Sequence, residues 1–177
     1  MATGRLVLRA AVGGLMVGHG LQKLTGRFDG PGLEGTGRMM ESIGMHPARQ
    51  QAVAVALTET VGGGLTAAGF LSPLGPAMIT GAMAVAIRKV HGQDGLWAQD
   101  GGFEYNAVLL VAAFALAAEG PGLLSLDGLL RRQRSGLRWA VVELALADNL
   151  AARHEAPDVG GGDTVAFDDN PVVLRQA

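Results

Sequence analysis

The 177-residue sequence contains no cysteine. This absence excludes disulfides, thiolate catalysis, iron–sulfur clusters and cysteine-type zinc sites. Any redox chemistry must therefore come from a bound cofactor or a partner protein. Aromatic residues make up only 5% and charged residues only 17% of the chain, and there is no basic stripe with interleaved aromatic side chains, which argues against nucleic acid as a partner.

Apolar residues dominate the composition of the chain. They account for 49% of the chain, alongside 28 glycines, a composition unusual for a soluble domain. Four apolar segments lie at about residues 5–24, 51–71, 74–90 and 104–118, and a helix of the length of residues 51–71 is about as long as a hydrocarbon core is thick, roughly 30 Å. The sequence therefore predicts an all-α fold: an integral membrane four-helix bundle in the lipid bilayer, formed by residues 1–130.

The connections between these segments carry their own signals. In the first loop, Met39, Met40 and Ile43 give a short apolar face that Gly44 can cap, which predicts a short amphipathic helix. The two prolines of residues 72–76 (SPLGP) predict a tight turn between the second and third spans. Glycines 62–64 predict close approach of neighbouring helices.

The C-terminal part divides in two. Residues 131–154 form a basic, amphipathic helical extension that suits either an interfacial helix or a helix docked on the bundle. Residues 155–177 are acidic and glycine-rich, which predicts disorder. Four spans place both termini on one side, and the arginine cluster that follows the fourth span favours the cytoplasmic side, although Lys and Arg are otherwise balanced between the two sides.

Glu59 lies near the middle of the second span, where an ionisable side chain is costly and usually marks a functional site. Because successive spans alternate in direction, His19, Arg88, His91 and Glu104 are expected at the same end of the bundle as Glu59. Such a set predicts a polar pocket that opens toward the long loops. Gln22 shares a helix face with His19 and joins the candidate ligand-binding residues.

Three interpretations of these residues stay open. In the first, Glu59 and His19 are catalytic, with Glu59 relaying a proton, while Gln22, Arg88, His91 and Glu104 bind a quinone-type or small polar substrate. In the second, Glu59 pairs with Arg88 or His19 only to lock the helices together. In the third, His19 and His91 ligate a haem, which helical bundles can do but which no motif here requires. No metal-ion site is predicted.

Four short motifs in a fixed order carry a resemblance to a known family. They are HGLQK at residues 19–23, GPGLEGT at residues 30–36, Glu59 followed by glycines, and the segment from GFEY at residues 102–105 to LSLD at residues 124–127. Together, over residues 5–130, the chain resembles the DoxX family of small four-helix bacterial membrane proteins, which includes the DoxD-type subunit of thiosulfate:quinone oxidoreductase.

The resemblance implies a multi-pass protein of the bacterial inner membrane. It also implies a subunit of a membrane-associated oxidoreductase system, with soluble or membrane-bound redox partner proteins. Residues 131–177 lie outside the resemblance, so a second hypothesis from another class remains: a non-enzymatic membrane scaffold that recruits soluble partners through this extension. A quinone that co-purifies with the protein would separate the two hypotheses.

Overall fold

The computed structural model describes residues 2–132 and 134–155, and within them it contains helices and no strand, which confirms the predicted all-α fold. A π-helical turn, Ile87–His91, follows α4 directly, and two short 3₁₀ turns, Gly92–Asp94 and Ala98–Asp100, lie in the loop before α5. The α-helices are α1 (Ala2–Thr25), α2 (Gly32–Ser42), α3 (Ala48–Ala68), α4 (Leu74–Ala86), α5 (Glu104–Glu119), α6 (Leu126–Leu129) and α7 (Leu137–Glu155).

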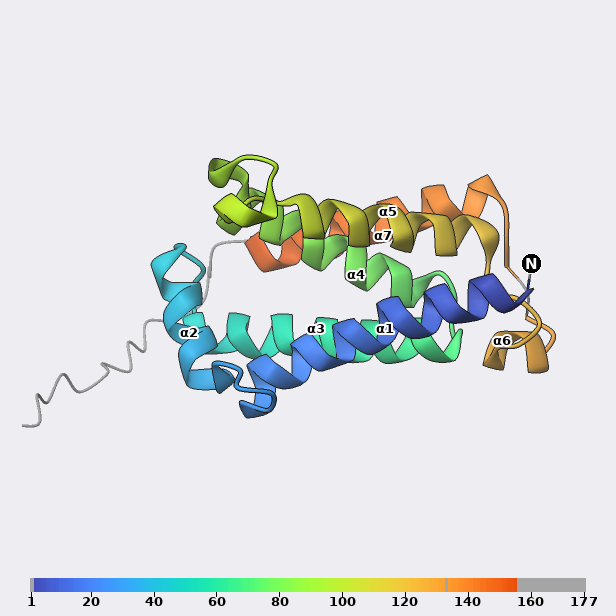
Figure 1. Cartoon of the computed structure of the whole chain (residues 1–177), viewed down its shortest axis with the longest axis horizontal. Helices are drawn as coiled ribbons and strands as arrows, with labels where there is room; N and C mark the ends of the chain where they lie inside the picture. The colour runs from blue at the N-terminus through green and yellow to red at the C-terminus, as the bar shows by residue number, and fades with distance from the viewer. Residues whose placement is uncertain (1, 133, 156–177) are drawn as a thin grey trace, which may run out of the picture.

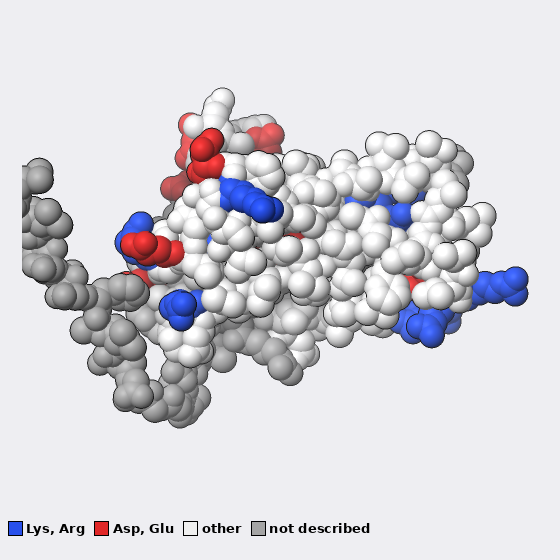
Figure 2. All heavy atoms as spheres, turned by 90° about the horizontal axis from the view of Figure 1, so that it is seen from below, with Lys and Arg blue, Asp and Glu red and all other residues white. Residues whose placement is uncertain are grey.

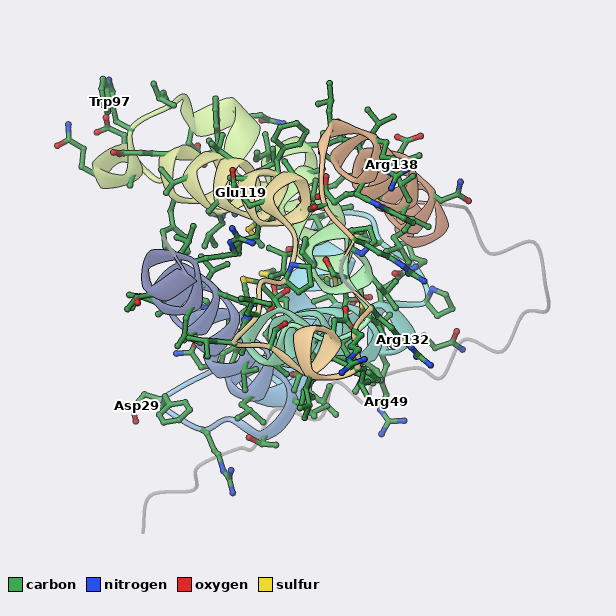
Figure 3. All side chains as sticks on the ribbon, turned by 90° about the vertical axis from the view of Figure 1, so that its right-hand side faces the viewer. Asp29, Arg49, Trp97, Glu119, Arg132 and Arg138 are labelled. Atoms are coloured by element: carbon green, nitrogen blue, oxygen red, sulfur yellow. The ribbon has the colours of Figure 1, made fainter. Side chains whose placement is uncertain are left out.

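Five long helices run along the same axis, while α2 crosses one end of the bundle and α6 lies at the other end, beside the N-terminus (Figure 1). α1 packs most extensively against α3, and α4 contacts α3, α5 and α7. The four apolar segments predicted as helices correspond to α1, α3, α4 and α5. Asp29, Arg49 and Trp97 project outward from the periphery of the bundle in the end-on view (Figure 3).

α7 is the fifth long helix, and it docks on the bundle rather than lying apart from it. It contacts α4 and α5, through a buried face made of Ala140, Glu143, Ala147 and Ala151. α7 runs back toward the α2 end, opposite the start of α1 (Figure 1). The predicted placement of both termini on one side rested on four long helices and did not include α7. Residues 156–177, predicted to be disordered, lie outside the described residues.

The first loop and the turn before α4 form as predicted. α2 ends with paired hydrogen bonds from Gly44 N to Glu41 O (3.0 Å) and from Met45 N to Met40 O (2.9 Å). Gly44 has φ +73°, a conformation that glycine adopts without steric cost, so it caps the helix as expected.

The turn between α3 and α4 is held from a distance by Asp127. This side chain is 2% exposed and accepts hydrogen bonds from the backbone N–H groups of Leu71 (3.2 Å) and Ser72 (2.8 Å). Because these donors lie just beyond the end of α3, Asp127 links the α6 segment to the turn and satisfies two backbone donors that would otherwise be unpaired.

Consecutive glycines of α3 face different neighbours. A Cβ on Gly63 would lie 2.6 Å from the Gly13 carbonyl oxygen of α1, and a Cβ on Gly62 would lie 2.7 Å from Met78 Cβ of α4. A Cβ on Gly64 would meet nothing within 4 Å. The predicted packing role of these glycines is therefore confirmed for Gly62 and Gly63, and it is wrong for Gly64.

Substituting alanine at two adjacent glycines should give opposite results. Gly63→Ala forces α1 and α3 apart and should cost about 1–3 kcal/mol or more, as overpacking does. Gly64→Ala adds a methyl group in open space and should stabilise α3 by up to about 1 kcal/mol, the helix-propensity difference between the two residues. Unfolding midpoints in the same detergent would measure both, and equal midpoints would show that the helices are not this close.

The outward faces of the long helices carry exposed apolar side chains. Figure 2 shows one side of the molecule, on which charged residues gather toward the two ends and the middle is largely uncharged. Among the described residues, no helix has both the length and the apolar character that a membrane span requires. The exposed apolar residues include Val7 and Leu15 of α1, Leu57 and Val61 of α3, Val108 and Val111 of α5, and Val141 and Leu144 of α7.

Candidate functional site

A buried ion pair joins α1 to α3 at the α2 end of the bundle. Lys23 Nζ lies 2.6 Å from Glu59 Oε2, and the two side chains are 21% and 7% exposed. Lys23 belongs to the last turn of α1, so its ammonium reaches sideways to Glu59, which lies midway along α3. This is the buried carboxylate that the sequence singled out, and it is paired.

His19 connects the same face of α1 to α5. Its Nδ1 lies 3.1 Å from Gln22 Oε1 and its Nε2 lies 3.4 Å from the Tyr105 hydroxyl. The two rings meet edge-on with centroids 5.9 Å apart. Gln22 in turn donates to the Phe28 carbonyl (3.2 Å), which fixes its amide.

We call His19, Gln22, Lys23, Glu59 and Tyr105 the polar cluster. His19, Gln22 and Lys23 share one face of α1 because they stand at i, i+3 and i+4. Since His19 contacts Tyr105 and Lys23 contacts Glu59 from this one face, the ion pair and the His19–Tyr105 contact belong to one group. Tyr105 is 42% exposed, and the polar cluster can therefore be reached from the side of the bundle at α5.

The predicted partners of Glu59 were wrong. Its ion pair is with Lys23, whereas Arg88 is exposed on the π-helical turn after α4 and His19 bonds to Gln22 and Tyr105. The prediction failed because the sequence places Lys23 at the end of a span, and nothing in it shows that the long lysine side chain turns back toward α3.

Two other predicted site residues, His91 and Glu104, lie at the same end of the bundle but hold the loop before α5. His91 Nδ1 lies 2.7 Å from the Gly101 carbonyl oxygen. Glu104 Oε2 accepts a hydrogen bond from the backbone N–H of Ala98 (3.1 Å). The structure thus brings His19, Gln22 and Glu59 together, while His91 and Glu104 bond to the backbone of the loop before α5.

Two members of the polar cluster, Lys23 and Tyr105, were not among the predicted site residues. The i, i+4 spacing of Lys23 from His19 was the available signal for the first. Tyr105 stands beside Glu104 at the start of α5, and nothing in the sequence distinguished the two. Both belong to motifs on which the family resemblance depends.

The polar cluster contains hydrogen-bond donors and a carboxyl group that can transfer a proton, but it does not contain a set of metal ligands. Within the described ranges, no group of three or more His, Asp or Glu side chains is arranged to hold a metal ion. His19 and His91 each have their own hydrogen-bond partners. Imidazole, phenol and carboxylate groups can form hydrogen bonds to a polar ligand and transfer a proton.

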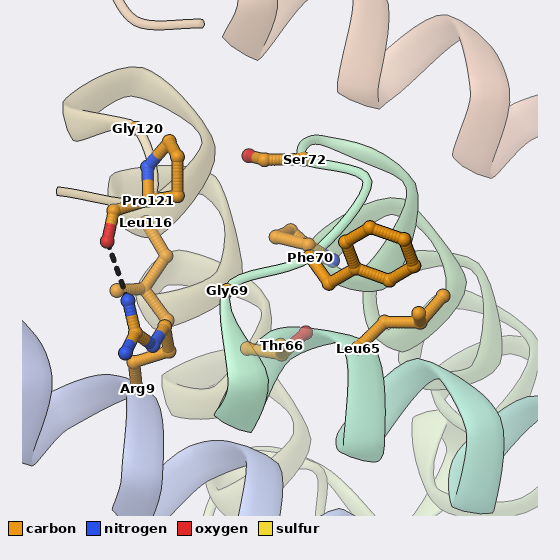
Figure 4. Close-up of a pocket in the computed structure, with 10 residues that line it drawn as sticks. Arg9, Leu65, Thr66, Gly69, Phe70, Ser72, Leu116, Gly120 and Pro121 are labelled. Atoms are coloured by element: carbon orange, nitrogen blue, oxygen red, sulfur yellow. Dashed lines mark hydrogen bonds between the residues drawn. The ribbon is translucent and has the colours of Figure 1, made fainter. Parts of the chain in front are cut away.

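The opposite end of the bundle has two hollows. One, beside Arg9, has a volume of about 10 Å³, room for about one water molecule (Figure 4). There the Arg9 guanidinium donates to the carbonyls of Ala67 (2.9 Å), Pro121 (2.5 Å) and Leu124 (2.6 Å). The other is a groove of about 180 Å³ between α1 and α5, lined partly by Arg5 and Glu119. Both are smaller than ordinary ligand pockets of roughly 300–1,000 Å³.

The fold and the polar cluster together define a small helical bundle with an ionisable group buried between its long helices at one end. The chain belongs to the DoxX family, whose model matches residues 4–92. That stretch covers α1 to the π-helical turn and includes His19, Lys23 and Glu59, whereas α5, α6 and α7 lie beyond it. No match was found among curated proteins or among solved structures. The DoxX family suggests a membrane protein.

Proposed function

We propose that the chain is a multi-pass inner-membrane subunit of an oxidoreductase system, in which the polar cluster binds a quinone-like or similar small molecule at the edge of the bundle. The contact between His19 and Tyr105, beside the buried Lys23–Glu59 pair, is the observation that supports it most. These four residues come from three helices, α1, α3 and α5. Tyr105 can be reached from the side of the bundle, and the ionisable pair beside it is buried. The exposed apolar faces of the long helices support contact with lipid.

The residues present suit a ligand that carries a carbonyl oxygen. His19 Nε2 or the Tyr105 hydroxyl would donate a hydrogen bond to that oxygen, and the exposed side of Tyr105 would let the ligand approach from the bilayer. Lys23 would stabilise negative charge near the oxygen, and Glu59 would hold or release a proton. A bound quinone supplies a two-electron, two-proton acceptor, and a redox partner protein would supply the electrons.

Ligand extraction tests the proposal directly. Protein solubilised gently from membranes should carry a quinone that mass spectrometry identifies. The variants His19→Ala and Tyr105→Phe should retain at least about tenfold less of it, the loss expected when about 1.4 kcal/mol of hydrogen bonding is removed. His91→Ala is the matched control, because His91 lies at the same end of the bundle but bonds to the Gly101 carbonyl.

A wild-type protein that carries no quinone and binds none when a short-chain quinone is titrated into it would contradict the proposal. The scaffold hypothesis predicts that result, together with a co-purifying protein that is lost when residues 131–177 are removed. Equal quinone retention by the wild type, His19→Ala and Tyr105→Phe would also show that the ligand binds elsewhere.

A further inference from the structure

Glu143, midway along α7, is fully buried at 0% exposure. It faces α4, where the Thr80 hydroxyl donates a hydrogen bond to Glu143 Oε1. The second carboxyl oxygen, Oε2, is also buried and has no hydrogen-bond partner within the described residues. A carboxylate in this position would be stabilised by a single hydrogen bond, far less than the loss of its hydration costs.

Within the part of the chain that the structure describes, no positive charge compensates for this burial. Among the described residues Glu143 takes part in no ion pair. α4, the helix that it faces, contains no ionisable residue from Leu74 to Ala86. α5, the second helix that packs extensively against α7, has ionisable residues only at its two ends: Glu104, Tyr105 and Glu119.

The ionisable neighbours of Glu143 along α7 do not compensate a charge on it either. The nearest ionisable side chains along the chain are Arg138 and Asp148, and both are exposed. The buried positions around Glu143 are Ala140, Ala147 and Ala151. These small side chains let α7 approach α4 closely: a Cβ on Gly81 would lie 3.0 Å from the Ala147 carbonyl oxygen.

We infer that Glu143 is a proton-binding site: its carboxyl group is held as the neutral acid between α4 and α7, and the bound proton allows α7 to dock along the bundle. The neutral acid keeps the hydrogen bond with Thr80 and avoids the cost of a buried, unpaired charge. When the proton leaves, the carboxylate gains by reaching water, which requires α7 to separate from α4. Docking is therefore favoured at low pH and weakened as the pH rises.

This inference is independent of the proposed ligand site, since the polar cluster lies on α1, α3 and α5 and Glu143 lies on α7. It assigns a role to a region beyond the stretch that the family model matches. Proton binding at Glu143 would couple the position of the C-terminal helix to the protonation state of the bundle interior.

Labelling with a carbodiimide tests whether the proton is bound. Dicyclohexylcarbodiimide, an apolar reagent, adds to protonated carboxyl groups in apolar surroundings. The full-length protein at neutral pH should be labelled at Glu143, which peptide mass spectrometry would locate. Glu119 is the matched control, because its side chain is exposed to water and paired with Arg5, so it should label at least about tenfold less. Equal labelling of Glu119 and Glu143, or no labelling of Glu143, would overturn the inference.

An engineered disulfide tests whether the proton controls docking. A Cβ on Gly81 would lie 3.5 Å from Leu150 Cβ, a separation that a disulfide can bridge. In the doubly substituted chain Gly81→Cys/Leu150→Cys, which has no other cysteine, the yield of this bond should fall at least about tenfold between roughly pH 5 and pH 9. Thiolate chemistry alone would change it in the opposite direction, because thiols react faster as they ionise.

The same pair in a Glu143→Gln background is the control. Glutamine keeps the shape of the side chain and can still accept the hydrogen bond from Thr80, but it cannot ionise. Its disulfide yield should therefore not fall as the pH rises. If both backgrounds show the same pH profile, protonation of Glu143 does not control the docking of α7, and the inference is wrong.

Discussion

Replacing Lys23 by methionine is expected to lower the free energy of unfolding by about 3 kcal/mol, because it leaves the Glu59 carboxylate buried without its partner. The ammonium lies 2.6 Å from Glu59 Oε2, and Glu59 is 7% exposed. Methionine retains the apolar stem of the lysine, so the packing of α1 against α3 should change little. The measurement is the unfolding midpoint of purified protein in one detergent at neutral pH.

Replacing the other member of the ion pair, Glu59, should lower the free energy of unfolding by less. In Glu59→Gln the unpaired group is Lys23, which is 21% exposed and can turn its ammonium toward water, so a loss of about 1–2 kcal/mol is expected. The double variant Lys23→Met/Glu59→Gln should be more stable than Lys23→Met alone, because no unpaired charge remains. If adding Glu59→Gln does not restore stability to Lys23→Met, the two side chains do not interact in the protein.

The double variant also separates the two interpretations of Glu59. A side chain that only locks helices can be replaced together with its partner without loss of function. If the polar cluster binds a quinone-like ligand, the stabilised double variant should still lose ligand retention. Arg88→Met is the matched control, because it removes an exposed arginine at the same end of the bundle. It should not restore stability to Glu59→Gln, although the sequence suggested Arg88 as a partner of Glu59.

The helices of the bundle could be predicted because their signals are local. Apolar runs and the prolines of residues 72–76 delimit α3 and α4. Gly44 ends the α2 segment in a left-handed backbone conformation, which other residues adopt only at a steric cost. Each of these signals is contained within a few residues of sequence. The third apolar segment, 74–90, is helical over the predicted extent, but the chain changes from α4 to a π-helical turn at Ile87.

The docking of α7 could not be predicted with the same means. Its large apolar residues, such as Val141 and Leu144, point outward and are exposed. The face that packs consists of alanines and Glu143, and such a face produces little hydrophobic contrast. An inward carboxyl group reverses the usual amphipathic pattern, so sequence periodicity alone left the interfacial and docked positions open.

Partner choice within the polar cluster was also beyond the sequence. Spacing showed that His19, Gln22 and Lys23 share a face of α1. Which of them reaches Glu59 depends on how α1 and α3 are rotated against each other, and this rotation is set by the glycine contacts between them, such as the one at Gly63. The sequence could therefore predict the end of the bundle at which the polar residues meet but not their pairs.

The second large effect is expected at the other end of the bundle, at Arg9. This arginine is 4% exposed, and no carboxylate pairs with it among the described residues. Its guanidinium instead binds the carbonyls of Ala67, Pro121 and Leu124. The first belongs to the last turn of α3, where the helix dipole favours a cation, and the other two belong to the loop between α5 and α6. Arg9 thus ties three segments together.

Arg9→Met should lower the free energy of unfolding by about 3 kcal/mol or more, because one buried and two partly buried carbonyls lose their donor and each unsatisfied group costs about 1–3 kcal/mol. Arg9→Lys should restore only part of this loss, since a single ammonium cannot reproduce the planar fork of the guanidinium.

Arg5→Met is the matched control one turn earlier on α1. Its ion pair with Glu119 has side chains 26% and 68% exposed, so its removal should cost less than about 1 kcal/mol. Chemical denaturation of the three variants in one detergent would measure the differences, and equal losses for Arg5→Met and Arg9→Met would show that Arg9 does not hold these carbonyls.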